Sequence, residues 1–401
     1  MENLKINNLM KLSPPAKDYQ VTLSNWRKYP YNKWAFVHTR QILPTSEIKT
    51  NRQFVDCFDQ SLINMDDLSI NHNNKKLLFK KVLNDCDTDA FLIMHRGKLV
   101  YEHFNNFTDK STPHIIFSVS KSLTSLTTGI LQENNSLNVD KKISYYLPEI
   151  MGSAYQDATI RNLLDMNIAS GFVEDYLDTS GIFKEYRNAT GWDVSDKDFD
   201  QTENGLRQFL SNLPKSKHEH GSKYHYCSPH SDLLGWIIER VTNETFSNAI
   251  SNLLFKPSGT NYEANVTLDK WGASRSAGGI SIAPYDLLKI GELVRCEGSN
   301  KQGQIIPASW IYDIQNYNEK RAWQNQDKLE RFPNGNYRSK WYQSGFKDNQ
   351  FCAIGIHGQN IWINPKKELT IIRMSSASDP VNIETEELMF SVFEAIGNEL
   401  K

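Results

Sequence analysis

The sequence predicts a mixed α/β fold (α+β in arrangement) in which an antiparallel sheet flanked by helices is built from both ends of the chain. Apolar runs typical of strands occur at residues 90–104 and again at 351–374, and helical periodicity dominates between them. Short hairpin connections favour antiparallel pairing of the strands. We therefore expect a sheet of five or more strands, with residues 1–118 and 341–401 forming the sheet domain and residues 119–340 forming an inserted all-helical domain.

The N-terminal part of the chain, residues 1–80, is expected to be an irregular arm that packs on the body. Prolines interrupt any long helix there, and a short helix is expected only near its end, at Leu77–Val82. The arm also holds several large aromatic residues close together: Trp26, Tyr31, Trp34 and Phe36. A disordered tail carries few such residues, so we expect these side chains to pack against the rest of the protein.

Five runs of residues have the composition of strands. Two of them, Ala90–Met94 and Leu99–Phe104, flank a glycine-containing turn at His95–Lys98 and predict a hairpin. The other three come late in the chain: Phe351–Ile356, Asn360–Ile363 and Glu368–Met374. An amphipathic helix over Val381–Leu400 is expected to close the chain.

The helical signals between the strands come from apolar residues that repeat at the spacing of one helix face. The first helix is expected to begin at Ser118 and to stop at Asn134-Asn135, where asparagine can take a left-handed cap conformation. Another is expected to start with Thr159 as its cap. Two further helices are expected over Ser231–Val241 and Ala283–Val294.

The first candidate motif is Ser118-Val119-Ser120-Lys121, at the start of the predicted helix. Residues three apart on a helix lie side by side, so the Ser118 hydroxyl and the Lys121 amine can meet. Serine needs a neighbouring base to act as a nucleophile, and a desolvated lysine can lose its proton near neutral pH and be that base. Taken alone, the pattern is more often a capped surface helix with a solvated lysine, because serine is a good N-cap.

Two further motifs lie later in the chain. In Tyr224-His225-Tyr226-Cys227-Ser228, a tyrosine hydroxyl beside an ammonium can ionise more easily and relay a proton. The alternative interpretation is an aromatic packing cluster at a helix start. The stretch Ala353–Gln359 places Gly355 in a predicted strand, where glycine often marks close approach by a ligand or another element. The alternative interpretation of Gly355 is that it forms a β-bulge or shapes a hairpin.

In this order the motifs resemble the penicillin-recognising serine hydrolases, which comprise class C β-lactamases, DD-peptidases, related esterases and nylon-oligomer (6-aminohexanoate-dimer) hydrolases. Ser118–Lys121 matches the family's Ser-x-x-Lys, and Tyr226-Cys227-Ser228 matches its Tyr-x-Asn/Ser. Similarity to the nylon-oligomer branch lies in Ser170-Gly171, Glu174-Asp175-Tyr176 and Gly355–Gln359. The resemblance covers most of the chain and implies a β-lactamase/DD-peptidase-like fold.

The resemblance implies a serine hydrolase that cleaves an amide or ester bond of a small substrate through an acyl-enzyme, without a cofactor. Ser118 is then the nucleophile, Lys121 the main base, and Tyr226 the group that relays protons to the leaving group. The oxyanion would be bound by the backbone N–H of Ser118 and, by the family's motif, that of Ile356. Substrate contacts are expected from Tyr176, in a loop region at 172–205 that lies over the cleft in the resembling branch, and from Ser228, Gly355 and His357.

Departures from the family pattern bear on the substrate. Ala353-Ile354-Gly355 takes the place of Lys-Thr-Gly, so the cation that would hold a substrate carboxylate is missing. His357 lies on the same predicted strand face as Ala353 and Gly355 but is mostly neutral near pH 7. His225 and His230, the latter standing where relatives often carry asparagine, are weaker candidates for contact. We expect hydrolysis of small esters or ω-amino-acid-type amides and weak or absent β-lactamase activity.

Other functions remain open from the sequence. The first alternative is β-lactamase or DD-peptidase activity, and the second is a β-lactamase-like binding scaffold whose chemistry is vestigial. A zinc site formed by His218, His220 and His225 is disfavoured because their spacing fits no His-Glu-x-x-His helix, and we expect no metal. Without a Gly-x-Ser-x-Gly elbow or a glycine-rich phosphate loop, an α/β-hydrolase or a nucleotide enzyme is disfavoured too.

Composition limits the partners. The 401 residues carry a formal net charge of −2 and no block of lysine or arginine, which disfavours nucleic acid and anionic membranes as partners. The five cysteines are scattered without Cys-x-x-Cys spacing, and neither a signal peptide nor a stretch of transmembrane length is evident. These features predict a reduced, cytoplasmic protein, and they leave its oligomeric state open.

Overall fold

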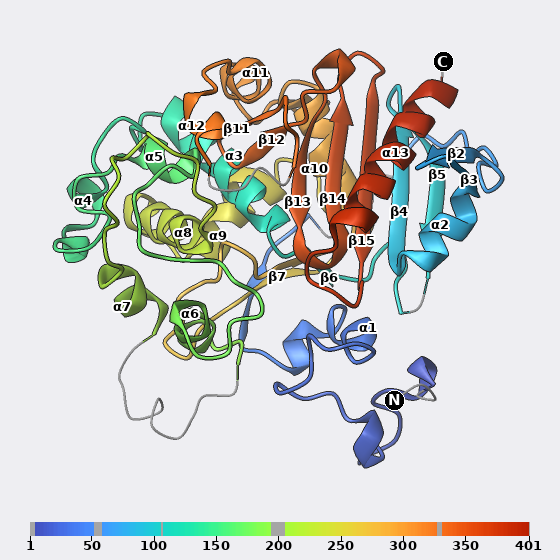
Figure 1. Cartoon of the computed structure of the whole chain (residues 1–401), viewed down its shortest axis with the longest axis horizontal. Helices are drawn as coiled ribbons and strands as arrows, with labels where there is room; N and C mark the ends of the chain where they lie inside the picture. The colour runs from blue at the N-terminus through green and yellow to red at the C-terminus, as the bar shows by residue number, and fades with distance from the viewer. Residues whose placement is uncertain (1–4, 52–57, 106, 194–204, 327–330, 401) are drawn as a thin grey trace.

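The computed structural model describes residues 5–51, 58–105, 107–193, 205–326 and 331–400. Its central element is a seven-stranded antiparallel sheet in the order β11-β12-β13-β14-β15-β4-β5 (Figure 1). Its strands are β4 (Thr88–His95), β5 (Lys98–Phe104), β11 (Asn336–Arg338), β12 (Trp341–Gln343), β13 (Phe351–Gly355), β14 (Gln359–Asn364) and β15 (Leu369–Ser375). Strands from the early and the late parts of the chain meet where β15 pairs with β4. The expected antiparallel sheet of five or more strands is confirmed.

Both faces of this sheet are buried, as alternate residues of β4 demonstrate. Phe91 and Ile93 share an apolar cluster with Phe393, whereas Leu92 belongs to a second cluster that contains Leu287. The helices that supply these partners are α2 (Phe79–Asp85) and α13 (Ile383–Glu399) on one face and α10 (Pro284–Arg295) on the other (Figure 1). The sheet is therefore the middle layer between helices. The tight turn between β4 and β5 is made by Arg96 and Gly97, which both have left-handed backbone conformations with φ of 50° and 73°.

The helices between the two halves of the sheet include those predicted from Ser118, from Thr159 and over Ser231–Val241, together with others that were not predicted individually. They are α3 (Val119–Glu133), α4 (Ile143–Tyr146), α5 (Ile160–Leu164), α6 (Ile182–Ala189), α7 (Leu206–Ser211), α8 (Ser228–Thr242), α9 (Phe246–Ile250), α11 (Ala308–Asn316) and α12 (Arg321–Gln324). Asn135, just past the end of α3, has a left-handed φ of 60°. Thr159 caps α5 in a capping box with Asn162. The predicted helix starts at Ser118 and Thr159 are confirmed.

A second, four-stranded antiparallel sheet has the order β1-β7-β8-β6. Its strands are β1 (Thr45–Ile48), β6 (His114–Ile115), β7 (Ala264–Thr267) and β8 (Ile280–Ile282). The expectation that residues 119–340 are all-helical is therefore wrong, because β7, β8 and β11 lie there. Strands of three or four residues offer too few alternating positions to reveal a period of two. The second sheet matters for the site because β6 runs directly into the turn that carries Ser118.

The N-terminal arm packs on the body, as its aromatic content predicts. It contains the short helix α1 (Asn32–Ala35) and the hairpin β2 (Ser69–His72) and β3 (Lys75–Leu78), whose first strand lies against α13. Trp26 and Phe36 are buried in one apolar cluster with Phe117, the residue that precedes Ser118. The arm thus reaches the neighbourhood of the predicted nucleophile.

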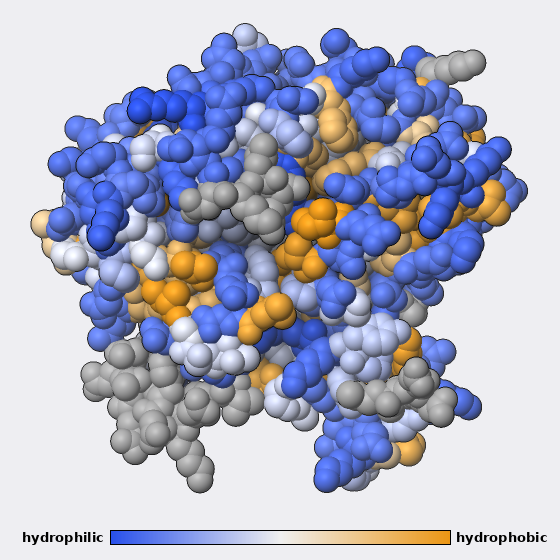
Figure 2. All heavy atoms as spheres, viewed as in Figure 1, coloured by the Kyte–Doolittle hydropathy of each residue, from blue (hydrophilic) through white to orange (hydrophobic). Residues whose placement is uncertain are grey.

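Among the residues that the structure describes, no helix combines the length and apolarity needed to cross a membrane. On the face drawn in Figure 2, apolar side chains form small separate groups among hydrophilic ones.

Candidate active site

The predicted nucleophile lies at a sharp entry into α3. Phe117 has a positive φ of 41°, a conformation that costs a non-glycine residue about 1–2 kcal/mol, and Ser118 follows as the N-cap of the helix. Within the first turn, the Ser118 Oγ lies 2.8 Å from the Lys121 Nζ. The contact expected from the three-residue spacing is present.

Lys121 is nearly inaccessible, with 2% of its surface exposed. Its Nζ donates to the carbonyl oxygen of Ala277 at 2.7 Å in addition to its contact with Ser118. Burial lowers the pKa of Lys121 to about 8, although the negative charge of Glu174 opposes this shift. An appreciable fraction of the amine is therefore neutral near physiological pH, which is the form that can accept the serine proton.

Tyr226 completes the group around Ser118. Its side chain interacts with that of Ser118, and its ring centroid lies 5.2 Å from the Lys121 Nζ. Burial raises the pKa of Tyr226 well above its ordinary value, and neighbouring Tyr342 acts in the same direction. The expectation that the ammonium eases ionisation of this tyrosine is wrong, because desolvation outweighs it. The neutral phenol can donate a proton.

The strand β13 approaches the start of α3 very closely at Gly355. A Cβ atom there would lie 2.7 Å from the carbonyl oxygen of Ile116 and 3.1 Å from the backbone nitrogen of Ser118. Only glycine fits this contact without displacement, so the close approach inferred from the sequence is present. It brings the next residue, Ile356, to the same cavity wall as Ser118.

Glu174 is a site residue that the sequence reasoning did not single out. Its carboxylate accepts hydrogen bonds from the Tyr176 hydroxyl at 2.7 Å, from the Ser228 backbone N–H at 2.6 Å and from the Ser228 hydroxyl at 2.8 Å. It thereby ties the loop that carries Tyr176 to the first residue of α8. The signal available in the sequence was its place in the Glu174-Asp175-Tyr176 stretch.

Asp232, which the sequence reasoning did not single out either, positions Ala277, whose carbonyl oxygen contacts Lys121. One of its carboxylate oxygens accepts from the Ala277 N–H at 2.7 Å, and the other accepts from Tyr186 and Arg275. Asp232 is 2% exposed, so its charge is balanced by the buried Arg275 guanidinium. The partners are far apart in the sequence, and no local pattern indicates this network.

The candidate catalytic groups open onto a cavity of about 780 Å³. Ser118, Tyr226, Tyr176, Gly355 and Ile356 all line it. The remaining lining residues are Glu174, Asp175, Leu177, Tyr224, His225, Trp323, Gln326, Arg331, Tyr342, Ile354, Asp379, Pro380, Val381 and Glu386. Ser228 lines a smaller adjoining space together with Ser118 and Lys121. The cavity therefore brings together most of the predicted site residues.

His357, which we expected to contact the substrate, is not among the residues that line the cavity. β13 ends at Gly355, and His357 has φ of 60°, so it does not share a strand face with Ala353 and Gly355 as we expected. Its ring is buried, its Nδ1 lies 2.8 Å from the Ala377 carbonyl oxygen, and burial lowers its pKa to about 4. His230 is likewise fully buried.

The histidines considered as zinc ligands have separate partners. His220 Nδ1 accepts from the Ala169 N–H at 3.0 Å, and His225 Nε2 lies 2.8 Å from the Phe172 carbonyl oxygen. In the part of the chain that the structure describes, no group of three or more His, Cys, Asp or Glu side chains is arranged to hold a metal ion.

Comparison with known proteins identifies relatives in sequence and in fold. The Beta-lactamase family model matches residues 79–392. The 6-aminohexanoate-dimer hydrolase of Paenarthrobacter ureafaciens is 27% identical over 368 residues, covering 92% of this chain and 91% of that protein. Among solved structures, the "putative 6-aminohexanoate-dimer hydrolase from Bacillus anthracis" has a TM-score of 0.88 at 24% identity, covering 96% of this chain and 98% of that one. The class C β-lactamase of Rhodobacter sphaeroides shares the fold, with a TM-score of 0.52 at 15% identity over 80% of this chain and 98% of that one.

Proposed function

This chain belongs to the beta-lactamase family of hydrolases, and on that premise we propose that it is a serine hydrolase that cleaves an amide or ester bond of a small substrate through an acyl-enzyme. The observation that carries the proposal is the cluster of Ser118, Lys121 and Tyr226, of which Ser118 and Tyr226 line a substrate-sized cavity and Lys121 contacts the Ser118 hydroxyl.

In the proposed reaction, the neutral amine of Lys121 takes the proton of the Ser118 hydroxyl as its oxygen attacks the substrate carbonyl. The tetrahedral intermediate collapses when its bond to the leaving group breaks, and the Tyr226 phenol donates a proton to that group. Lys121 returns a proton to Tyr226. Water then attacks the acyl-enzyme with the same groups in the reverse roles, which releases the acid and restores the Ser118 hydroxyl.

The negative charge on the intermediate is proposed to be held by the backbone N–H groups of Ser118 and Ile356. Both residues line the cavity, and the tight contact at Gly355 fixes the end of β13, which Ile356 directly follows, against the start of α3. Each such donor is expected to contribute about 3–4 kcal/mol to stabilisation of the transition state.

The charges around the cavity favour substrates without a carboxylate near the scissile bond. Arg331 is the one lysine or arginine among the described residues that line the main cavity, and Glu386 neutralises it in a two-pronged ion pair. Acidic side chains at Glu174, Asp175 and Asp379 line the same cavity. A carboxylate beside the scissile bond would be repelled there, which fits small esters, and ω-amino-acid-type amides whose carboxylate lies at the far end of the chain, better than penicillins.

The name of the Paenarthrobacter relative points to the same class of substrate, a dimer of 6-aminohexanoate. We extend that class to this chain because such a dimer carries its carboxylate at the far end of a methylene chain, so it needs no cation beside the scissile amide of the kind that Lys-Thr-Gly enzymes use. Ala353, at the corresponding position, is fully buried in the apolar core.

The test is covalent labelling followed by substrate comparison. A fluorophosphonate probe is expected to label the purified protein once, and Ser118→Ala is expected to abolish that labelling. The value of kcat/KM for p-nitrophenyl butyrate should then exceed that for a chromogenic cephalosporin. An unlabelled wild-type protein would indicate a vestigial scaffold, and a cephalosporin turned over ten times faster than the ester would indicate a β-lactamase.

A further inference from the structure

The N-terminal arm contacts the residues that flank both proposed oxyanion donors, although it precedes the segment that the family model matches. The ring centroid of Phe36 lies 4.8 Å from that of Phe117 and 5.0 Å from that of His357. The Phe117 and His357 rings are themselves 5.4 Å apart. Because Phe117 precedes Ser118 and His357 follows Ile356, one side chain of the arm contacts a residue next to each of the two proposed oxyanion donors.

The backbone at both flanking positions depends on such contacts. Phe117 and His357 have positive φ values of 41° and 60°, which are uncommon for residues other than glycine and are adopted less readily by phenylalanine than by histidine. The Ser118 N–H belongs to the peptide group that follows Phe117, and Ile356 begins the turn whose shape His357 sets. Left-handed conformations at bulky residues persist only where the surroundings hold them, so the ring contacts with Phe36 bear directly on the donor positions.

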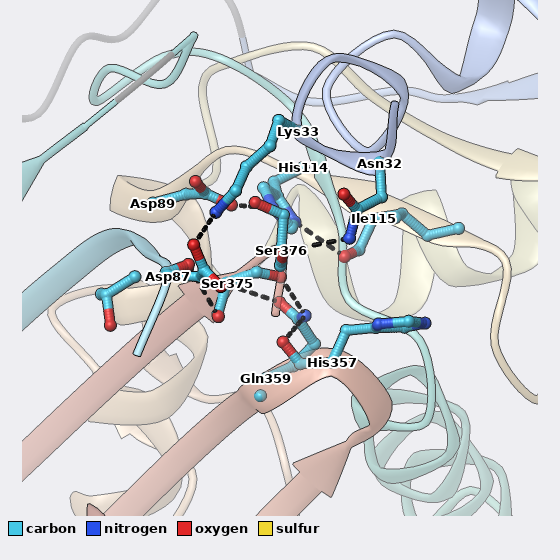
Figure 3. Close-up of polar contacts among 12 residues, drawn as sticks. Asn32, Lys33, Asp87, Asp89, His114, Ile115, His357, Gln359, Ser375 and Ser376 are labelled. Carbon is cyan, nitrogen blue, oxygen red and sulfur yellow. Dashed lines mark hydrogen bonds and ion pairs between the residues drawn. The ribbon is translucent and has the colours of Figure 1, made fainter. Parts of the chain in front are cut away.

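A polar contact reinforces the apolar one (Figure 3). The amide nitrogen of Asn32, in α1, donates to the carbonyl oxygens of Ser376 at 2.9 Å and Ala377 at 3.1 Å. The Ala377 carbonyl oxygen also accepts from His357 Nδ1 at 2.8 Å. The backbone N–H of His357 donates to the carbonyl oxygen of Pro380, a cavity-lining residue, at 2.9 Å. Asn32 and His357 therefore both form hydrogen bonds with the segment that begins at Ser376.

The arm is itself fixed where these contacts arise. The Phe36 carbonyl oxygen accepts from the Ile115 N–H at 2.8 Å, which joins the arm to β6. Buried Lys33 forms an ion pair with Asp87 at 2.5 Å (Figure 3). α1 and the residue that follows it are thus joined both to β6 and to the residue that precedes β4.

We propose that Phe36 and Asn32 are positioning residues for catalysis, which hold the Ser118 and Ile356 backbone donors in place through Phe117 and His357. This inference rests on the serine-hydrolase function proposed above. A purely structural arm would affect stability alone, whereas a positioning arm affects the transition state more than substrate binding.

The first experiment compares Phe36→Leu with Trp34→Leu, a matched loss of a buried aromatic side chain in the same arm. Trp34 stacks on His38, with ring centroids 4.0 Å apart. With p-nitrophenyl butyrate, Phe36→Leu is expected to lower kcat about 10-fold or more with KM nearly unchanged. This loss is smaller than that for complete removal of one oxyanion donor, because the variant only displaces the donors. Trp34→Leu should keep kcat within about 2-fold of wild type. Phenylboronic acid, which forms a tetrahedral adduct with the serine, should lose affinity for Phe36→Leu in parallel with kcat.

A second pair of variants covers the case in which Phe36→Leu fails to fold. His357→Asn retains a side-chain N–H for the Ala377 carbonyl and a residue that tolerates positive φ, whereas His357→Ala removes both. We expect kcat to fall less in His357→Asn than in His357→Ala by about 5-fold or more, at comparable KM.

The outcomes separate the two proposals. Equal kcat values for Phe36→Leu and Trp34→Leu, or for His357→Asn and His357→Ala, would overturn the positioning role while leaving the serine-hydrolase function intact. Wild-type protein that fails to react with the fluorophosphonate at Ser118 would instead overturn the function itself.

Discussion

Replacement of Gly355 by alanine tests the geometry on which the oxyanion hole depends. The backbone there is extended, with φ −128° and ψ 151°, so alanine meets no conformational penalty and the effect is steric. The new Cβ would lie 2.7 Å from the Ile116 carbonyl oxygen, whereas real Cβ atoms essentially never come within 3.0 Å of a neighbour. β13 and the start of α3 must therefore separate by at least a few tenths of an ångström. We expect kcat to fall about 10- to 100-fold and stability to fall by about 1–3 kcal/mol.

The assay is steady-state hydrolysis of p-nitrophenyl butyrate, together with thermal unfolding. Gly291→Ala is the control, because its Cβ would lie 2.9 Å from the Thr370 Cγ2 where α10 packs on β15, away from Ser118. The control should change the unfolding temperature but keep kcat within about 2-fold of wild type. Wild-type kcat in Gly355→Ala, or an equal loss in Gly291→Ala, would refute the argument.

Further predictions follow from the neighbouring contacts. Since Lys121 must be neutral to accept a proton and burial lowers its pKa to about 8, kcat/KM should rise as pH increases through about 8 and then level off; a flat profile from pH 6 to 10 would exclude it as the base. Asp232→Asn should lower kcat about 10-fold because it weakens the hold on Ala277, and an unchanged kcat would assign Asp232 to folding alone. Tyr176→Phe removes the hydroxyl bonded to Glu174 and should lower kcat/KM several-fold with a short amide; unchanged kcat and KM would remove Tyr176 from the site.

The parts of the fold that the sequence predicted depend on short-range patterns. Ser118 and Lys121 belong to one helical turn, so their spacing allows the contact that the structure shows at 2.8 Å. The long strands β4, β13, β14 and β15 were evident because each holds enough residues for strand composition to register. β11 and β12, with three residues each, carry no such signal.

The errors at the site arise from long-range packing. The strand period placed His357 beside Gly355, but the chain turns away after Gly355 and His357 packs against Phe36, more than three hundred positions earlier. The direction of the Tyr226 pKa shift depends on burial, which no motif reveals. Asp232 and Ala277 meet only because the folded chain brings α8 beside the segment before β8.

The most direct test of the central claim is detection of the acyl-enzyme. Rapid acid quenching of a reaction with p-nitrophenyl butyrate, followed by mass spectrometry of proteolytic peptides, should find one butyryl group on the peptide that carries Ser118 during turnover. The Ser118→Ala protein should carry none and should lose activity by several orders of magnitude. A butyryl group on another residue, or turnover by Ser118→Ala at the wild-type rate, would contradict the proposed mechanism.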